Sequence, residues 1–391
     1  MKRALFLFSG LLALLLSTES CRRDAMEAQT PEDCLVKASA RNGEIIPGEF
    51  IVTYRAEAAM PGGTLARRVD VTNTVLSENR IASTAVESRF DGTVPGFVAH
   101  LTEAQARQLQ QDSRVQSVEP DRIVSMCGCL EVAEPRSLTW DVRKTGYGNG
   151  LNFSEKTAWI IDTGIDLDHP DLNVDQTRSR SFISGQTSAD DENGHGSHVA
   201  GVIGALNNKQ GTLGIASGVK LVALKVLDQE GEGRLSSTIQ AVAHVVQNGQ
   251  PGDVVNLSLG GDGISQSLER QIKAAADAGI LFAVAAGNEG EPARTHSPAR
   301  FNHPNVFTVS AVDSTDAFAS FSNYGNDVVD VAAYGVRIAS TYRGGRYAIL
   351  SGTSMAAPHV AGLLLIRGKN LPTRGTARND PDGVADPIAR E

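Results

Sequence analysis

The chain has 391 residues, which is long enough for two or three domains. Its hydrophobic fraction of 41% and its 39 glycines are typical of a packed globular protein with many turns, and they argue against a disordered chain. The net charge of −9 argues against a nucleic-acid-binding surface, so no nucleic acid is expected among its partners.

The N-terminus has the pattern of an export signal. Two basic residues precede the apolar run 4–16, which is too short to span a membrane. We therefore interpret residues 1–20 as a signal peptide and expect a secreted or cell-envelope protein. Two alternatives stay open: ordinary signal-peptidase cleavage near Ser17–Ser20, or a lipid anchor on Cys21. The leucine-rich run favours the lipid anchor, and Glu19 in the cleavage region disfavours it. A buried N-terminal helix is the third alternative.

The four cysteines all lie in the first third of the chain, at Cys21, Cys34, Cys127 and Cys129. Whatever follows residue 130 must therefore hold together without disulfides. Cys127 and Cys129 flank a single glycine, whereas metal sites usually space their cysteines by two or more residues, so this pair does not predict a metal site. A disulfide from Cys34 to either member of the pair is left undecided.

Residues 46–125 carry the pattern of a small α+β domain. Runs rich in β-formers predict strands at 49–54, on both sides of Pro95-Gly96, and at 115–121. A helix is expected within 64–79. The capping-box pair Thr102 and Gln105 predicts the start of a second helix that runs to about Gln111. No residue of this domain suggests catalysis.

Residues 122–136 show no convincing element and are interpreted as an exposed connector, the kind of segment that proteases cut readily. From residue 157 onward, short β-rich runs alternate with helical runs. Strands are predicted at 157–161, 220–226, 254–259, 280–286, 307–312 and 328–332. Helices are predicted at 236–248 and 266–278, each closed by a glycine.

This alternation predicts an α/β domain with a mostly parallel sheet flanked by helices on both faces. Several of the strands are apolar almost throughout, as in a sheet that is buried on both sides. The catalytic domain is placed at 137–391, and its polar end, residues 367–391, is expected to form a loose tail.

Four chemically capable residues stand at strand ends or helix starts, where parallel sheets gather their functional groups. Asp162 and Asn288 each end a strand, and His195 and Ser354 each open a helix. Nucleophilic catalysis needs this set: serine attacks, histidine accepts its proton and aspartate holds the imidazole. An amide can stabilise the oxyanion.

Other ionisable residues near these four have plainer interpretations. Asp166 and Asp168 are interpreted as turn residues. His198 follows His195 by three positions, but the usual zinc pair is four apart with a glutamate between, so His198 is interpreted as structural. His359 is expected to be packed inside its helix. Asn288 alone could simply cap a turn.

Three motifs resemble those of the subtilisin-like serine proteases, peptidase family S8, and especially the proteinase K-like branch. They are Asp162-Thr163-Gly164, His195-Gly196-Ser197-His198-Val199-Ala200-Gly201 and Gly352-Thr353-Ser354-Met355-Ala356-Ala357-Pro358-His359. They follow the Asp, His, Ser order known for subtilisin. The resemblance covers roughly 137–366, and 46–125 is more weakly similar to the inhibitor I9-type propeptide of the family. Ser197 stands where threonine is commoner.

The resemblance implies roles for particular residues. Asp162, His195 and Ser354 would be the catalytic triad, and Asn288 would form the oxyanion hole with the backbone N–H of Ser354. Small, apolar pocket walls imply broad specificity with an apolar P1 preference, and Glu232 would favour basic residues further from the cut. His296 is expected near the pocket rim. The residues implied to contact substrate are Gly231, Glu232, Gly233, Ser258, Leu259, Gly260, Ala285, Ala286 and Gly287.

A structural calcium site is also implied by the resemblance. Asp330 lies 24 positions before the serine, as in the proteinase K-like branch, and the carbonyls of Pro304 and Val306 would complete the oxygen ligands. Asp330 as a plain surface residue is the alternative. No cofactor is expected for catalysis itself.

The sequence thus predicts a monomeric, secreted serine endopeptidase made as a self-processing zymogen. Its partners would be protein or peptide substrates and its own propeptide, which would act as an intramolecular inhibitor. Two alternatives are a binding or regulatory protein of the same fold with a dead site, and an N-terminal domain that inhibits other proteases.

Overall fold

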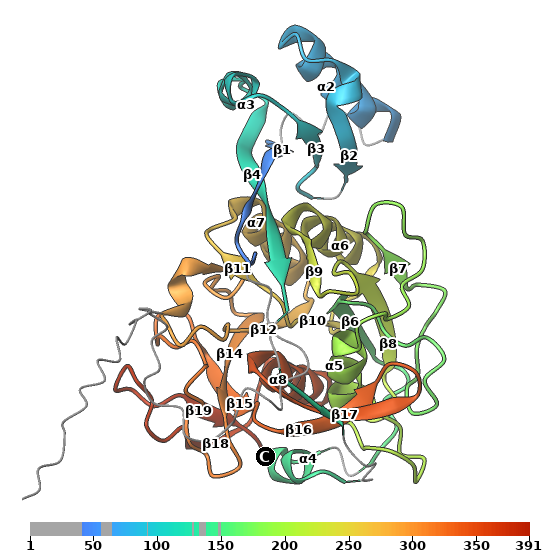
Figure 1. Ribbon diagram of the computed structural model, residues 1–391, viewed down its shortest axis with the longest axis vertical. Coiled ribbons are helices and arrows are strands. Elements are labelled where there is room, and N and C mark those ends of the chain that lie inside the picture. The colour runs from blue at the N-terminus through green and yellow to red at the C-terminus, as the bar shows by residue number, and fades with distance from the viewer. Residues whose placement is uncertain (1–40, 56–64, 92, 127–128, 133–137, 148–149) are drawn as a thin grey trace, which may run out of the picture.

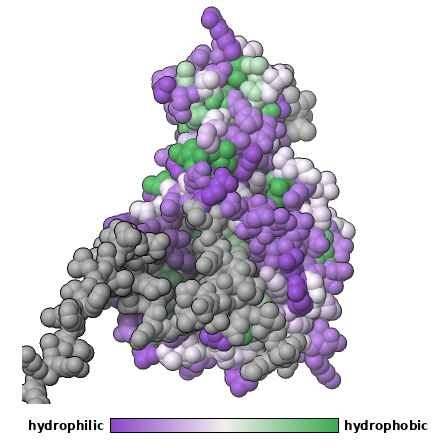
Figure 2. Space-filling model, viewed as in Figure 1, coloured by the Kyte–Doolittle hydropathy of each residue, from purple (hydrophilic) through white to green (hydrophobic). Residues whose placement is uncertain are grey.

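The computed structural model describes residues 41–391, apart from 56–64, 92, 127–128, 133–137 and 148–149. The expected signal peptide, Cys21, Cys34 and Cys127 lie outside the described residues. Figure 1 shows a small N-terminal domain standing on a larger one. The visible surface of the larger domain is mainly hydrophilic where it is coloured in Figure 2. Within the described ranges, no helix is long and apolar enough to cross a membrane.

The small domain contains the four strands and two helices that the sequence predicts. Its strands are β1 (Ile45–Tyr54), β2 (Val86–Phe90), β3 (Gly96–His100) and β4 (Val115–Ser125), in the antiparallel order β2-β3-β1-β4. Its helices are α2 (Leu65–Glu78), the short η2 (Ser83–Ala85) and α3 (Glu103–Gln110). The capping box is present: the Thr102 side chain accepts from Gln105 N, and Gln105 Oε1 accepts from Thr102 N at 2.9 Å.

The two faces of the small sheet are buried against different partners, because side chains alternate along a strand. Phe50 and Val52 of β1 pack with Leu76 and Leu109 of the domain's own helices. Ile51, between them, joins a core cluster of the large domain. The small domain is therefore packed onto the large one through an apolar face.

The segment predicted as a featureless connector is in fact largely strand, which corrects that expectation. β4 continues to Ser125 and pairs antiparallel with β9 (Glu232–Arg234) of the large domain. After the undescribed residues 127–128, β5 (Cys129–Val132) pairs antiparallel with β17 (Arg346–Ser351). The sequence pattern missed both extensions because each depends on a partner strand more than 100 residues away.

The large domain is built on a nine-stranded sheet of order β18-β19-β15-β14-β12-β10-β6-β8-β7. Neighbouring strands in this sheet are parallel except β18 and β19, which are antiparallel. The strands are β6 (Thr157–Asp162), β7 (Arg180–Ser181), β8 (Lys220–Lys225), β10 (Val254–Leu257), β12 (Leu281–Ala285), β14 (Val306–Val312), β15 (Val331–Tyr334), β18 (Thr373–Thr376) and β19 (Pro387–Ala389).

Helices cover both faces of this sheet, as predicted. The helices are α4 (Trp140–Thr145), α5 (His195–Gly204), α6 (Leu235–Asn248), α7 (Gln266–Asp277) and α8 (Thr353–Arg367). Ile160 of β6 belongs to the same core cluster as residues of α5 and α8. The adjacent Trp159 and Ile161 belong to the cluster that contains residues of α6 and α7. Short additional elements are β11 (Gly261–Asp262), η3 (Ala293–Thr295), β13 (His296–Ser297) and β16 (Ile338–Tyr342).

Two expectations for the C-terminal third need correction. The strand predicted at 328–332 begins later, as β15, because Val331 and not Val328 is paired with β14. The predicted loose tail is ordered: β19 joins the main sheet beside β15, and Asp386 and Ile388 are both buried. The tail is polar in sequence because only a few of its side chains face inward.

Candidate active site

Asp162 and His195 meet at the carboxyl edge of the central sheet. Asp162 is the last residue of β6 and His195 is the first of α5, and both are almost fully buried. The Asp162 Oδ1 atom lies 2.8 Å from His195 Nδ1. An ionised carboxylate can only accept, so Nδ1–H donates, which leaves Nε2 as the nitrogen able to accept a proton.

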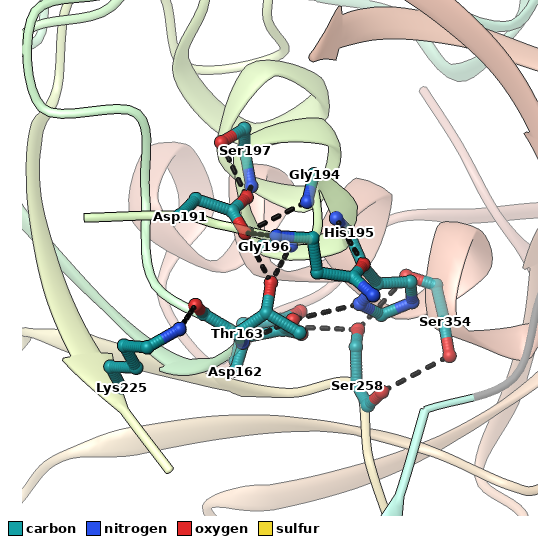
Figure 3. A network of polar contacts seen from close by, with 12 residues as sticks. Asp162, Thr163, Asp191, Gly194, His195, Gly196, Ser197, Lys225, Ser258 and Ser354 are labelled. Carbon is teal, nitrogen blue, oxygen red and sulfur yellow. Dashed lines mark hydrogen bonds and ion pairs between the residues drawn. The ribbon is translucent and has the colours of Figure 1, made fainter. Parts of the chain in front are cut away.

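Asp191 holds the start of helix α5, a role that the sequence analysis missed (Figure 3). One carboxylate oxygen accepts from Thr163 Oγ1 and from Gly194 N, each at 2.8 Å. The other accepts from the Ser197 backbone N at 2.9 Å and its Oγ at 2.6 Å. Gly194, the N-cap, has no side chain to cap the helix, so Asp191 supplies the acceptor. A carboxylate four residues before the helix was the available signal.

Ser354 opens α8 and is drawn on the opposite side of the His195 imidazole from Asp162 (Figure 3). Its hydroxyl donates to the Ser258 carbonyl at 3.1 Å, and Ser258 Oγ donates back to the Ser354 carbonyl at 2.9 Å. His195 Nε2 is buried and has no hydrogen-bond partner among the described residues. In this structure the Ser354 hydroxyl therefore donates to Ser258 and not to the imidazole.

Asn288 is oriented by Thr353, the residue before the serine. The Thr353 backbone N and hydroxyl both donate to Asn288 Oδ1, at 2.8 and 3.0 Å. A backbone N–H can only donate, so the amide atom facing it is the oxygen. The remaining hydrogen-bonding capacity of this amide is that of its NH₂ group, which is a donor.

The predicted substrate walls come together around one pocket beside Ser354. Its lining includes both predicted walls, together with Asn288, Glu289 and His296. Ser125, near the end of β4, also lines it. The wall residues are Ser258, Leu259, Gly260, Ala285, Ala286 and Gly287.

The third predicted segment, Gly231 to Gly233, is occupied by the chain itself. Val124 pairs with Gly233 and Ser125 with Glu232, and Met126 N donates to the Gly231 carbonyl at 3.2 Å. On the other side, Ser125 N donates to the Gly260 carbonyl at 3.3 Å. The end of β4 therefore lies between the two segments as an added β-strand.

Two acidic residues of β4 bind the starts of two helices in the large domain. Asp121 accepts from Ser236 N at 3.0 Å and from the Ser236 hydroxyl. Glu119 accepts from Ser265 Oγ at 3.0 Å and from Ser267 N at 3.2 Å. Burial raises the pKa of both carboxyls, and the helix N–H groups and hydroxyls oppose that shift. These contacts lie between domains, so local sequence patterns give no sign of them.

Other histidines have the structural roles that the sequence predicts. His198 Nε2 contacts the Ile338 and Ala348 carbonyls at 2.9 and 3.2 Å, and burial lowers its pKa to about 3. His359 Nε2 lies 3.0 Å from Asp141 Oδ2 inside the core. The Nε2 atom of His198 is therefore held by backbone carbonyls of the core.

The predicted calcium ligands lie at a second pocket. Pro304 and Asp330 line it together with Asn302, His303 and Asp327, and Val306 begins β14 next to it. Asp330 Oδ2 accepts from Thr308 N at 2.8 Å. Neighbouring atoms raise the Asp330 pKa to about 6 by desolvation of the carboxyl, although the residue as a whole is exposed. A carboxylate is an oxygen ligand of the kind that a hard cation such as calcium prefers.

A buried Asp–His pair beside a serine at a helix start, on the carboxyl edge of a parallel sheet, defines an α/β serine hydrolase. Residues 159–372 match the family model described as the subtilase family, and residues 50–126 match that of peptidase inhibitor I9. The chain belongs to the subtilase family. It is a subtilisin-like serine endopeptidase that carries an I9 propeptide domain.

Named relatives and solved structures agree with this assignment. The chain is 38% identical to a thermostable alkaline protease of Halalkalibacterium halodurans, over 76% of this chain and 81% of the relative. It is 40% identical to subtilisin E of Bacillus subtilis, over 72% of each chain. A crystal structure of a cold-adapted subtilisin-like serine proteinase matches with a TM-score of 0.57 and 32% identity, covering 65% of this chain and 98% of that one.

Proposed function

We propose that this chain is a secreted, self-processing zymogen whose Asp162, His195 and Ser354 hydrolyse peptide bonds through an acyl-enzyme. The observation that carries the proposal is the course of β4, whose last residues lie in the cleft as a peptide substrate would. The proposed first substrate is therefore this chain.

The chemistry follows from the groups at the site. Ser354 Oγ attacks the scissile carbonyl carbon while His195 Nε2 accepts its proton, and Asp162 stabilises the imidazolium. The oxyanion accepts hydrogen bonds from the Asn288 NH₂ group and the Ser354 N–H. The amine leaves with the proton from His195, and the acyl-enzyme remains. Water then attacks, again with His195 as base, and releases the acid and free Ser354.

The first scissile bond is proposed to lie between Met126 and Cys129. Met126 is the last residue held by Gly231, and Cys129 begins the strand that pairs with β17 close to Ser354. The pocket walls are made of alanine, glycine, leucine and serine, which supports broad specificity with apolar P1 side chains preferred.

The decisive experiment compares the purified wild-type chain with the Ser354→Ala variant. The wild type should lose its first ~130 residues, with a new N-terminus at 127–129, and should hydrolyse casein. The variant should stay full length. A wild type that stays uncut and inert, even after another protease removes the N-terminal region, would support the dead-site alternative. Inhibition of unrelated proteases by the small domain would be compatible with either result.

Export and anchoring are proposed from the first residues alone. The Cys21→Ser variant distinguishes the two cleavage routes. If Cys21 carries lipid, the wild type should fractionate with membranes and the variant should not. Equal release of both proteins would indicate an ordinary signal peptide. Monomeric behaviour of the processed enzyme is proposed as well, and light scattering would test it.

We further propose that Asp330, with the Pro304 and Val306 carbonyls, binds structural calcium. What supports this is a carboxylate with a raised pKa beside the pocket lined by Pro304. The charge of a bound cation would compensate for the lost hydration of Asp330 and hold the loop before β14 against the loop before β15.

A further inference from the structure

A second group of ionisable residues lies at the rim of the substrate pocket. Asp262 and His296 face each other across the β11–β13 pair, and Glu291 comes from the loop that follows Asn288. Their ligand atoms all lie within 4.8 Å of one another. His296 also lines the substrate pocket.

His296 is the unusual member, because it is buried and its outer nitrogen makes no hydrogen bond. The residue is only 4% exposed, and Nε2 has no hydrogen-bond partner among the described residues. Asp262 Oδ1 and Glu291 Oε1 nevertheless lie 2.8 and 3.1 Å from it. Both oxygens therefore lie to the side of the axis along which an N–H bond would point from Nε2.

The other ring nitrogen fixes the tautomer. Thr295 Oγ1 lies 3.1 Å from His296 Nδ1 and donates its single hydrogen to the Pro292 carbonyl. With its hydrogen directed at Pro292, the threonine oxygen is placed to accept from Nδ1–H. In the neutral imidazole this places the lone pair on Nε2, which faces two carboxylate oxygens. Such an arrangement repels itself unless a cation stands between the three atoms.

The distances suit a metal ion as that cation. An ion about 2.1 Å from one nitrogen and two oxygens separates those atoms by roughly 3 Å, and each oxygen then lies to the side of the nitrogen axis. One imidazole and two carboxylates form a mixed donor set of the kind that zinc-class cations accept. A hydrogen bond on Nδ1 is the usual support for a ligating histidine.

We propose that Asp262, Glu291 and His296 bind a divalent transition-metal cation of the zinc class at the rim of the substrate pocket. The ion joins β11, which continues the Gly260 wall, to the loop that leaves Asn288. Glu289 connects the two sites: its Oε2 accepts from Asn288 N at 2.9 Å and lies 3.8 Å from His296 Nε2. A metal ion bound at this site therefore stiffens both walls of the substrate pocket.

The site is accessible in the full chain. Asp262 and Glu291 are 64% and 50% exposed, so an ion can reach them while β4 occupies the cleft. A comparable cluster of Glu49, Glu87 and His100 lies at the domain junction. There the Arg234 guanidinium stands 3.0 and 2.7 Å from the two carboxylates and already supplies the positive charge. That cluster is a natural control.

The test uses full-length, tag-free Ser354→Ala protein freed of metal by a chelator. Co²⁺ is titrated while its visible d–d absorption is recorded, and Zn²⁺ is then added to displace it. We expect saturation at one equivalent, at least tenfold weaker binding in Asp262→Asn and Glu291→Gln, and unchanged binding in the control His100→Gln. Thermal unfolding without metal verifies that each variant is folded.

Absence of saturable Co²⁺ and Zn²⁺ binding would overturn the proposal, and so would equal binding by the wild type and the two carboxylate variants. His296→Gln is a third variant, and if it does not fold, the exposed carboxylates still decide. The Ser354→Ala protein is not expected to cut itself, so an absence of metal binding would leave the peptidase proposal unaffected. An effect of Zn²⁺ on the KM of the processed enzyme, by contrast, presupposes the proposed peptidase function.

Discussion

Asn288 Oδ1 accepts two hydrogen bonds from Thr353, one from the backbone and one from the hydroxyl. The residue just before the proposed nucleophile thus orients the proposed oxyanion donor. This couples two loops that are 65 positions apart in the chain. Small rotations of the amide matter because an oxyanion donor acts only within hydrogen-bond distance.

The Thr353→Val variant should lower kcat about tenfold with little change in KM, because the hydroxyl contact is lost and the backbone contact stays. Asn288→Leu should cost more, ~10²–10³, the loss known for the oxyanion asparagine of subtilisin itself. Thr353→Ser keeps the hydroxyl and is the matched control. If the valine and serine variants have equal kcat, Thr353 does not position Asn288.

Replacing Asp162 by asparagine should reduce turnover by ~10⁴, because the amide no longer fixes the imidazole tautomer or stabilises its charge. The Asp166→Asn variant serves as the control. Asp166 accepts from Gly345 N at 2.9 Å and is interpreted as a turn residue, so it should retain most activity. Kinetics with a chromogenic peptide measure both. A loss below tenfold for Asp162→Asn would contradict its assignment to the triad.

Asp121→Ala should weaken the hold of the propeptide on the enzyme. The variant leaves the Ser236 N–H and hydroxyl at the start of α6 without their buried acceptor, which costs roughly 1–3 kcal/mol. We expect a shorter lag between the first cut and full activity. Progress curves of substrate hydrolysis measure this lag. Glu103→Ala, an exposed change in the same domain, should leave the lag unchanged. An unchanged lag for Asp121→Ala would show that this contact does not limit release.

Asp386 should make the fold less stable as pH rises toward neutrality. Burial raises its pKa to about 7, the Asp380 and Asp382 charges add to that shift, and the Ser310 hydrogen bond opposes it. The folded state therefore retains a proton that the unfolded chain releases near pH 4. The contribution of protonated Asp386 to the free energy of unfolding is full below pH ~4 and is lost progressively as pH rises to ~7. The loss is no more than about 1.4 kcal/mol per pH unit.

The Asp386→Asn variant remains neutral and can still accept from Ser310, so it should be more stable than its parent above pH ~7. The two proteins should converge in acid. Thermal unfolding of both chains in the Ser354→Ala background, from acid to pH ~8, measures the difference. Parallel curves across that range would mean that Asp386 does not titrate as described.

Removing calcium should lower the unfolding temperature of the wild type, and Asp330→Asn should abolish that response. The physical reason is that an ion bound only to the folded state stabilises it by mass action. Asp190→Asn, at an exposed carboxyl outside this pocket, is the control. Identical melting with calcium and with chelator would argue that Asp330 is a surface residue without a bound ion.

Local sequence patterns predict the order of strands and helices and contain the three motifs around Asp162, His195 and Ser354. These features are local: strand and helix periodicity and glycine turns depend on neighbouring residues. The parallel sheet with helices on both faces followed from their alternation. Strand limits were less certain, as the late start of β15 at Val331 shows.

Contacts between distant segments could not be predicted from local patterns. The pairing of β4 with β9 and the return of Ile388 to the main sheet depend on partners that no local pattern identifies. The same holds for His296, whose two carboxylates come from β11 and from the loop that follows Asn288. Burial, hydrogen-bond direction and pKa arise from the assembled surroundings, so these properties appear only once the chain is folded.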